Sequence, residues 1–82
     1  MIIITPLSSE KNIRQIEREN VLAFLVERSA TKADIKRSVE ERFGVKVAAV
    51  RVLTNTSGQK HAYVKLAPQS TALDVATDLG LI

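Results

Sequence analysis

The stretch Thr31–Leu66 constrains the fold most, because its pattern predicts one helix followed by two strands. Thr31 and Asp34 have the spacing of a capping box, in which each side chain bonds the backbone of the other residue at a helix start. Apolar residues then recur every fourth position, which puts them on one side of the helix: Ile35, Val39 and Phe43. Gly44 follows at once, and glycine readily takes the left-handed conformation that ends a helix.

Two β-rich runs follow this helix. The first is Val45–Thr54, whose apolar positions change phase near Ala48, which predicts a β-bulge or a strong twist. The polar turn Asn55–Gly58 separates it from a second run, in which apolar and polar residues alternate. The apolar set is Ala62, Val64 and Leu66, and the polar set is His61, Tyr63 and Lys65. We therefore predict a hairpin.

Val21–Val26 is a continuous apolar run, so the strand that it predicts is apolar on both sides. Such a strand needs cover on both sides, and we expect helices on both faces of the sheet near it. The run from Ile2 to Ile4 predicts a short edge strand stopped by Pro6, because proline cannot donate a hydrogen bond to a ladder.

Two further helices are predicted outside these strands. The first is capped by Ser8 or Ser9 and runs to about Arg18; its few apolar residues place it on the surface. The second begins at Thr71 near the end of the chain. Its expected buried stripe consists of Ala72, Val75, Ala76 and Leu79.

The order of these elements predicts an α+β fold. We expect a small antiparallel sheet of three to four strands, with a split β-α-β core and helices packed on its faces. The Ala62–Leu66 strand should lie between the Val21–Val26 and Val45–Thr54 strands. The 82 residues are enough for one small domain, so residues 1–82 are assigned to one unit.

Composition narrows the possible environments and partners. The net charge is +3 and the isoelectric point is near 9.6, a basic balance that favours a nucleic acid or an acidic surface as partner. The chain has no cysteine, which excludes disulfides and thiolate metal sites. No apolar run is long enough for a membrane span, and the N-terminus does not have a signal-peptide pattern. We expect an intracellular protein used at full length, without membrane insertion.

Catalytic chemistry finds little support in the residues present. His61 is the only histidine, and no glycine-rich loop could hold a phosphate group. Glu40 and Glu41 are expected to form ion pairs with Lys36 and Arg37 one helical turn earlier. We therefore predict that the protein is not an enzyme and that it needs no cofactor and no metal.

The basic and aromatic side chains are the candidate site. Lysine and arginine can follow a phosphate backbone, and an exposed ring can stack on an unpaired base. The alternative is an ordinary solvated surface, since isolated basic side chains carry little specificity. The candidate RNA-binding residues are Lys11, Arg14, Lys32, Lys36, Arg37, Arg51, Lys60, His61, Tyr63 and Lys65.

The chain resembles archaeal-type large-subunit ribosomal proteins of the L23 family over nearly its whole length. The resemblance lies in the following elements: Pro6 with Ser9-Glu10-Lys11; the run 27–32; Asp34-Ile35-Lys36-Arg37 with Val39-Glu40 and Phe43; Val45-Lys46-Val47; Gly58 and Lys60 with Ala62-Tyr63-Val64-Lys65-Leu66; and the C-terminal Asp74-Val75-Ala76 with Leu79-Gly80.

The resemblance implies a small α+β domain in three layers that binds large-subunit ribosomal RNA beside the mouth of the nascent-peptide exit tunnel. It also implies a neighbouring small ribosomal protein and a role in docking the signal recognition particle and the protein-conducting channel. By position, it assigns RNA contacts to Lys11, Lys32, Lys36, Lys60 and Lys65.

At two places this chain departs from the family pattern, and the family's contacts and roles at those places cannot be assigned to it. The family usually has asparagine and threonine where this chain has Arg51 and Val52, so a phosphate contact from Arg51 would replace a contact from asparagine. The bacterial branch has a long basic hairpin loop that lines the tunnel, whereas the loop here is only residues 55–59. A tunnel-lining role is therefore not transferred.

Two other kinds of protein compete with this interpretation. One is a free-standing protein-interaction module that uses a sheet edge or the Val75/Leu79 side of the last helix. The other is a ligand-binding regulatory domain of the ferredoxin-like kind, but the sequence lacks the glycine-rich loop or clustered polar pocket that such a domain needs.

Overall fold

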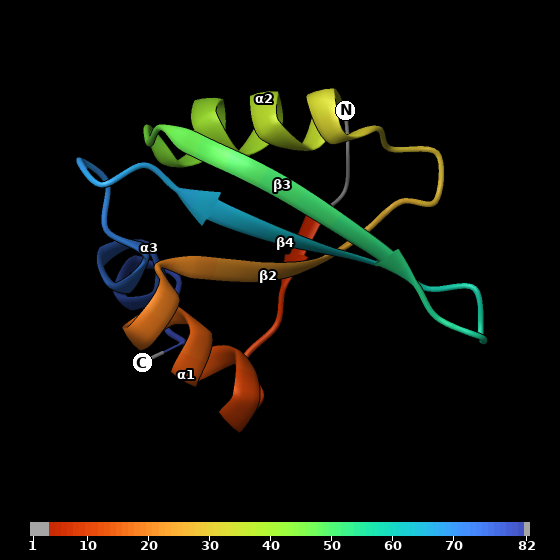
Figure 1. Cartoon of the computed structure of the whole chain (residues 1–82), viewed down its shortest axis with the longest axis horizontal. Coiled ribbons are helices and arrows are strands. Elements are labelled where there is room, and N and C mark those ends of the chain that lie inside the picture. Colours follow the sequence, from red (N-terminus) through yellow and green to blue (C-terminus); the bar gives the residue numbers. More distant parts are fainter. Residues whose placement is uncertain (1–3, 82) are drawn as a thin grey trace.

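The structure is a computed structural model that describes residues 4–81. It contains a four-stranded sheet and three helices (Figure 1). In chain order the elements are β1 (Ile4–Pro6), α1 (Glu10–Glu19), β2 (Val21–Val26), α2 (Lys32–Phe43), β3 (Val47–Thr54), β4 (Lys60–Leu66) and α3 (Ala72–Asp78).

The strand order β1-β2-β4-β3 confirms the predicted α+β topology. Every neighbouring pair is antiparallel, and β4 lies between β2 and β3, the two strands that α2 connects. This is the split β-α-β core that was predicted. β1 is the expected short edge strand, but Pro6 does not stop it: Pro6 is its last residue and pairs with Phe24. Ile2 and Ile3 of the predicted run lie outside the described residues.

Helix α2 begins and ends as its sequence predicts. The Thr31 hydroxyl accepts a hydrogen bond from the Asp34 N–H, and the Asp34 carboxylate accepts one from the Thr31 N–H, each at 3.1 Å. Gly44 closes the helix at φ 66°. The hydrogen bonds from the Thr31 backbone and side chain lower the pKa of Asp34. The capping box therefore stabilises the helix above the unfolded-state pKa of this carboxyl, and the stabilisation is lost as the pH falls through the folded-state value.

The main core lies between one face of the sheet and helices α2 and α3. Phe24 of β2 is fully buried and its ring stacks on Phe43 of α2, with centroids 6.0 Å apart. Helix α3 adds Val75 and Ala76 to the same cluster. The other fully or nearly fully buried side chains of this cluster include Leu22, Ile35, Val39, Ala62, Val64 and Leu66. Because Val75 is only 5% exposed and Leu79 packs against this core, that side of α3 is not free to bind a partner as the interaction-module alternative requires.

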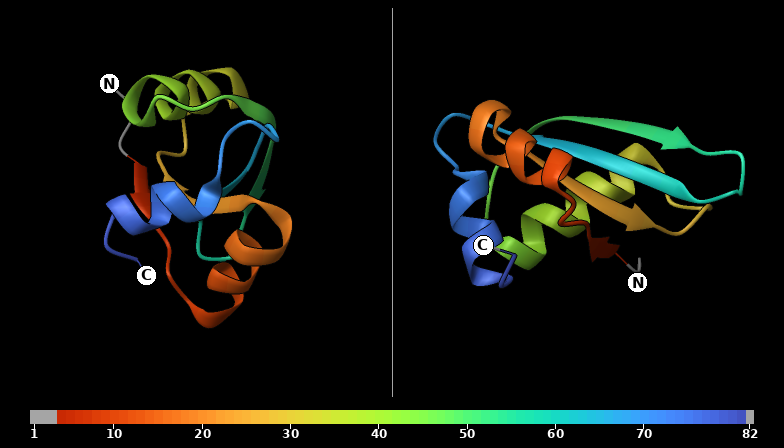
Figure 2. Two further views of the ribbon diagram at one scale, coloured as in Figure 1. Left: turned by 90° about the vertical axis from the view of Figure 1, so that its left-hand side faces the viewer. Right: turned by 90° about the horizontal axis from the view of Figure 1, so that it is seen from below.

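The second face of β2 is also covered, as its two-sided apolar pattern predicts. Ala23, which points away from the main core, is 3% exposed. Figure 2 shows α1 on the opposite side of β2 from α2. Among the strands, α1 packs mainly on β2, and within the described residues the second face of β4 and β3 stays open beyond it.

Asn20 joins the ends of three elements and has no counterpart among the predictions. It adopts the left-handed conformation, φ 59°, immediately after α1. Its side-chain amide donates to the carbonyl of Leu66 at 3.3 Å and to that of Ser70 at 2.9 Å. Its amide oxygen accepts from the Ala72 N–H at 2.6 Å and so caps α3 in place of Thr71.

The hairpin formed by β3 and β4 has a bulge at one end and a hydrogen-bonded turn at the other. The pairing register shifts between Val47 and Ala49, which confirms the predicted bulge. The turn is closed by the Asn55 side chain, whose oxygen accepts from the N–H groups of Ser57 and Gln59.

The predicted ion pairs of Glu40 and Glu41 are wrong. The carboxylate of Glu40 instead accepts a hydrogen bond from the Val47 N–H at 3.0 Å, which ties the end of α2 to the start of β3. Within residues 4–81 the one ion pair joins Arg14 to Glu10 at 3.4 Å.

Candidate nucleic-acid interface

The open face of the sheet gathers four of the predicted residues on β3 and β4. Arg51 lies directly across from Tyr63 in the β3–β4 pairing, and its guanidinium stands 5.2 Å from the centre of the tyrosine ring. Lys65 and His61 flank Tyr63 on the same side of β4, since alternate residues of a strand share a face. Arg51 and Lys65 are exposed, and the two aromatic side chains are half-buried.

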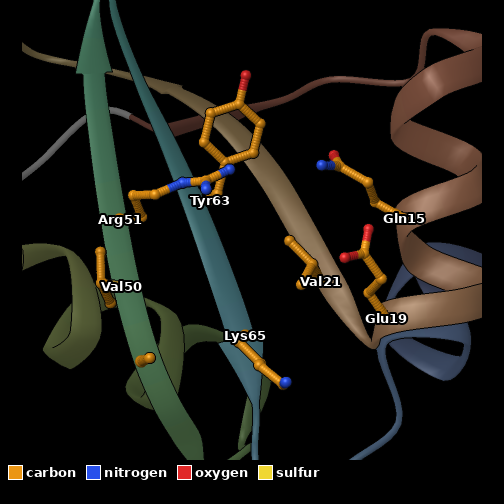
Figure 3. Close-up of a pocket in the computed structure, with 8 residues that line it drawn as sticks. Gln15, Glu19, Val21, Val50, Arg51, Tyr63 and Lys65 are labelled. Atoms are coloured by element: carbon orange, nitrogen blue, oxygen red, sulfur yellow. The ribbon is translucent and has the colours of Figure 1, made fainter.

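A groove of about 230 Å³ lies between this open face and α1 (Figure 3). The Arg51–Tyr63 pair stands at one end, and α1 forms the side wall. The lining residues are Gln15, Glu19, Val21, Ala49, Val50, Arg51, Tyr63 and Lys65.

The charges around the groove are free to meet a ligand. Arg51 and Lys65 form no ion pair within the part of the chain that the structure describes, and neither does Glu19. The cations come from the strands and the carboxylate comes from α1. A phosphate group is therefore attracted to the strand side of the groove and repelled from the helix side.

Five of the other predicted cations lie on two helices, α1 and α2. Lys32, Lys36 and Arg37 are exposed on α2, which covers the face opposite Tyr63. Lys11 and Arg14 are exposed on α1, and Lys11 lies one helical turn before Gln15 on the side of α1 near the groove. Arg14 is the partner of Glu10 in the exposed ion pair. The ten residues thus do not form one continuous surface.

Lys60 has an internal role that the sequence did not reveal. Its ammonium group donates to the carbonyl of Ala30 at 2.6 Å and to that of Arg28 at 3.3 Å. These bonds hold the loop that leads into α2 against the start of β4.

Replacing Lys60 by methionine should lower the free energy of unfolding by about 1–2 kcal/mol, because the Ala30 carbonyl is partly buried and loses its partner. Urea denaturation measures the change. Lys65→Met is the matched control, since Lys65 is exposed and makes no such bond in the described residues. Equal stability of the two variants would show that the loop does not depend on Lys60.

Gln15 and Glu19 are the groove residues that sequence reasoning missed. Both lie on the side of α1 that faces the sheet, four residues apart. The available signal was this spacing combined with the thin apolar stripe of α1, which leaves polar side chains to face the strands. This spacing does not show that Gln15 and Glu19 line a groove unless the position of α1 relative to the sheet is known.

Residues 4–81 contain neither a cluster suited to a metal ion nor a membrane-spanning helix. No three His, Asp or Glu side chains in this range gather closely enough to hold a metal ion. No helix in this range is long and apolar enough to cross a bilayer.

Comparison with known proteins agrees with the sequence resemblance. Residues 1–73 match the family described as ribosomal protein L23. The chain is 46% identical to the large ribosomal subunit protein uL23 of Methanococcus vannielii over 80 residues, which cover 98% of this chain and 93% of that protein. Members of this family are structural rather than catalytic proteins. The chain belongs to the ribosomal protein L23 family.

Proposed function

We propose that this chain is a structural constituent of the large ribosomal subunit that binds large-subunit ribosomal RNA through the open face of its sheet. The observation that carries the RNA contact is the grouping of Arg51, Tyr63 and Lys65 on one face, with both cations exposed and without an ion-pair partner in the described residues. Family membership supports the ribosomal setting. As a ribosomal protein, the chain is a cytoplasmic component of a ribonucleoprotein particle.

A second RNA contact is made by α2, on the other face of the sheet. Lys32, Lys36 and Arg37 of α2 lie on the other side of the sheet from Tyr63, so they reach a different RNA segment. The net charge of +3 supports phosphate contacts on both sides of the sheet. Lys60 contributes mainly through its bonds to the loop before α2.

The position in the ribosome is proposed from the family resemblance. The protein lies beside the mouth of the nascent-peptide exit tunnel, next to another small ribosomal protein. Its outer surface helps to dock the signal recognition particle and the protein-conducting channel. Crosslinking of assembled ribosomes, read out by mass spectrometry, tests each neighbour separately.

Removing two phosphate contacts should weaken RNA binding and flatten its dependence on salt. For the double variant Arg51→Ala/Lys65→Ala, the slope of log K against log salt should fall by about 2. Filter binding of a large-subunit RNA fragment over a salt series measures it. Lys32→Ala/Lys36→Ala tests the second layer in the same way.

The control must remove the same charge elsewhere. Arg42→Ala/Lys46→Ala removes two exposed cations that are not among the predicted contacts. The slope of this control should stay close to that of the unaltered protein. If the control and the open-face variant lose equal affinity, only net charge matters and the assigned face is wrong.

A further inference from the structure

The groove beside α1 has at one end a stacking platform, in which the Arg51 guanidinium lies over the Tyr63 ring. Two small apolar side chains, Val21 and Ala49, line it next to Lys65. The platform consists of the Tyr63 ring and the Arg51 guanidinium, which lie 5.2 Å apart (Figure 3). Aromatic rings and guanidinium planes are the side chains on which unpaired bases stack in RNA-binding proteins.

We propose that this groove takes one unpaired nucleobase of ribosomal RNA, stacked on the Arg51–Tyr63 platform, and that it prefers a base with an exocyclic amino group. The inference rests on the proposed RNA-binding function and gives it a defined site. A groove of about 230 Å³ holds one base and its sugar but not a duplex.

The distribution of charge sets the orientation of the nucleotide. Arg51 and Lys65 attract its phosphate to the strand side, whereas Glu19 on α1 repels it. The edge of the base therefore points toward α1. A carboxylate can only accept hydrogen bonds, so Glu19 favours a base that offers an amino group over one that offers a carbonyl oxygen.

Cytosine and uracil form the matched pair that tests this preference. They have similar ring size and stacking area, but cytosine presents an amino group where uracil presents an oxygen. The chain has one tyrosine and no tryptophan, so its intrinsic fluorescence reports on Tyr63 alone. Titrating the full chain with hexacytidylate should quench this fluorescence, and hexauridylate should bind about tenfold more weakly. Glu19→Gln should remove most of the difference.

The platform is tested by three variants and fluorescein-labelled hexacytidylate, with anisotropy as the readout. Tyr63→Leu should weaken binding by about 5- to 150-fold, the range for one base–aromatic stack. Tyr63→Phe keeps the ring and should retain the affinity. Leu73→Ala on α3 is the control, because Leu73 is exposed, does not line the groove and is not one of the predicted RNA contacts.

Each possible failure has a distinct meaning. If hexacytidylate binds without changing the tyrosine fluorescence, or if Tyr63→Leu binds it as well as the unaltered chain, the groove is not a base site. Equal affinity for the two oligonucleotides overturns the role of Glu19. In all three cases salt-dependent binding of the ribosomal RNA fragment would still support the proposed function, whereas loss of that binding would overturn it.

Discussion

Replacing Phe24 by alanine is expected to lower the free energy of unfolding by about 3–5 kcal/mol, the range for truncating a buried phenylalanine. Phe24 has no exposed surface, and it lies on β2 between the strand pairings to β1 and β4. A chain of this length has a total stability of about 4–12 kcal/mol. The variant should therefore be close to unfolding near room temperature. Urea denaturation followed by circular dichroism measures the loss.

Phe43→Ala provides the comparison within the same aromatic pair. Phe43 stacks on Phe24 but is only partly buried, so less surface is exposed to water on truncation and the cavity can be filled by solvent. Phe43→Ala should therefore lower the free energy of unfolding by about 2 kcal/mol. A larger loss from Phe43→Ala than from Phe24→Ala would mean that α2 packs more deeply than the structure shows.

Replacing Asn20 by alanine should lower the free energy of unfolding by about 3–4 kcal/mol, although the residue is polar and only half-buried. The substitution removes the side-chain bonds to Leu66, Ser70 and Ala72 and leaves partly buried groups unpaired. It also forces alanine into the left-handed conformation, which costs about 1–2 kcal/mol. A thermal melt with van't Hoff analysis measures the total.

Asn20→Gly separates the two contributions. Glycine adopts φ 59° without steric cost, so this variant lacks the side-chain bonds but not the backbone conformation. Its loss should be about 2–3 kcal/mol. If Asn20→Gly is as stable as the unaltered chain, the hydrogen bonds of Asn20 do not hold α3 in place.

The parts of the fold that the sequence predicted are those specified by neighbouring residues. The capping box of α2, its end at Gly44 and the alternation along β4 each depend on residues within one or two turns of one another. The bulge near Ala48 was visible as a change of phase for the same reason. Such local signals are also what identify the family.

The contacts that the sequence did not predict join residues far apart in the chain. Asn20 bonds residues 46–52 positions away, and Lys60 bonds backbone carbonyls 30 and 32 positions away. Each involves one polar side chain and a backbone group, and a backbone group has no sequence signature. The ion pair predicted for Glu40 failed because its carboxylate accepts from the Val47 N–H in place of a charged partner, and nothing in the structure explains why Glu41 forms none.

The candidate site was predicted as a set of residue types but not as a surface. Tyr63 and Lys65 share a face by their spacing alone, whereas the position of Arg51 beside them depends on the register after the bulge. The placement of Lys32 and Lys36 on the opposite layer depends on the side of the sheet that α2 crosses. Helical spacing cannot specify that side.

The hairpin turn held by Asn55 also bears on how proteins of this family can differ in length. It lies at the far end of the sheet from α1 and α3, and its hydrogen bonds stay within residues 55–59 (Figure 1). Lengthening such a connection adds only about 0.6 kcal/mol of closure entropy for each doubling. Evolution can therefore extend this tip into a long projection, or shorten it again, while the packed interior keeps its sequence.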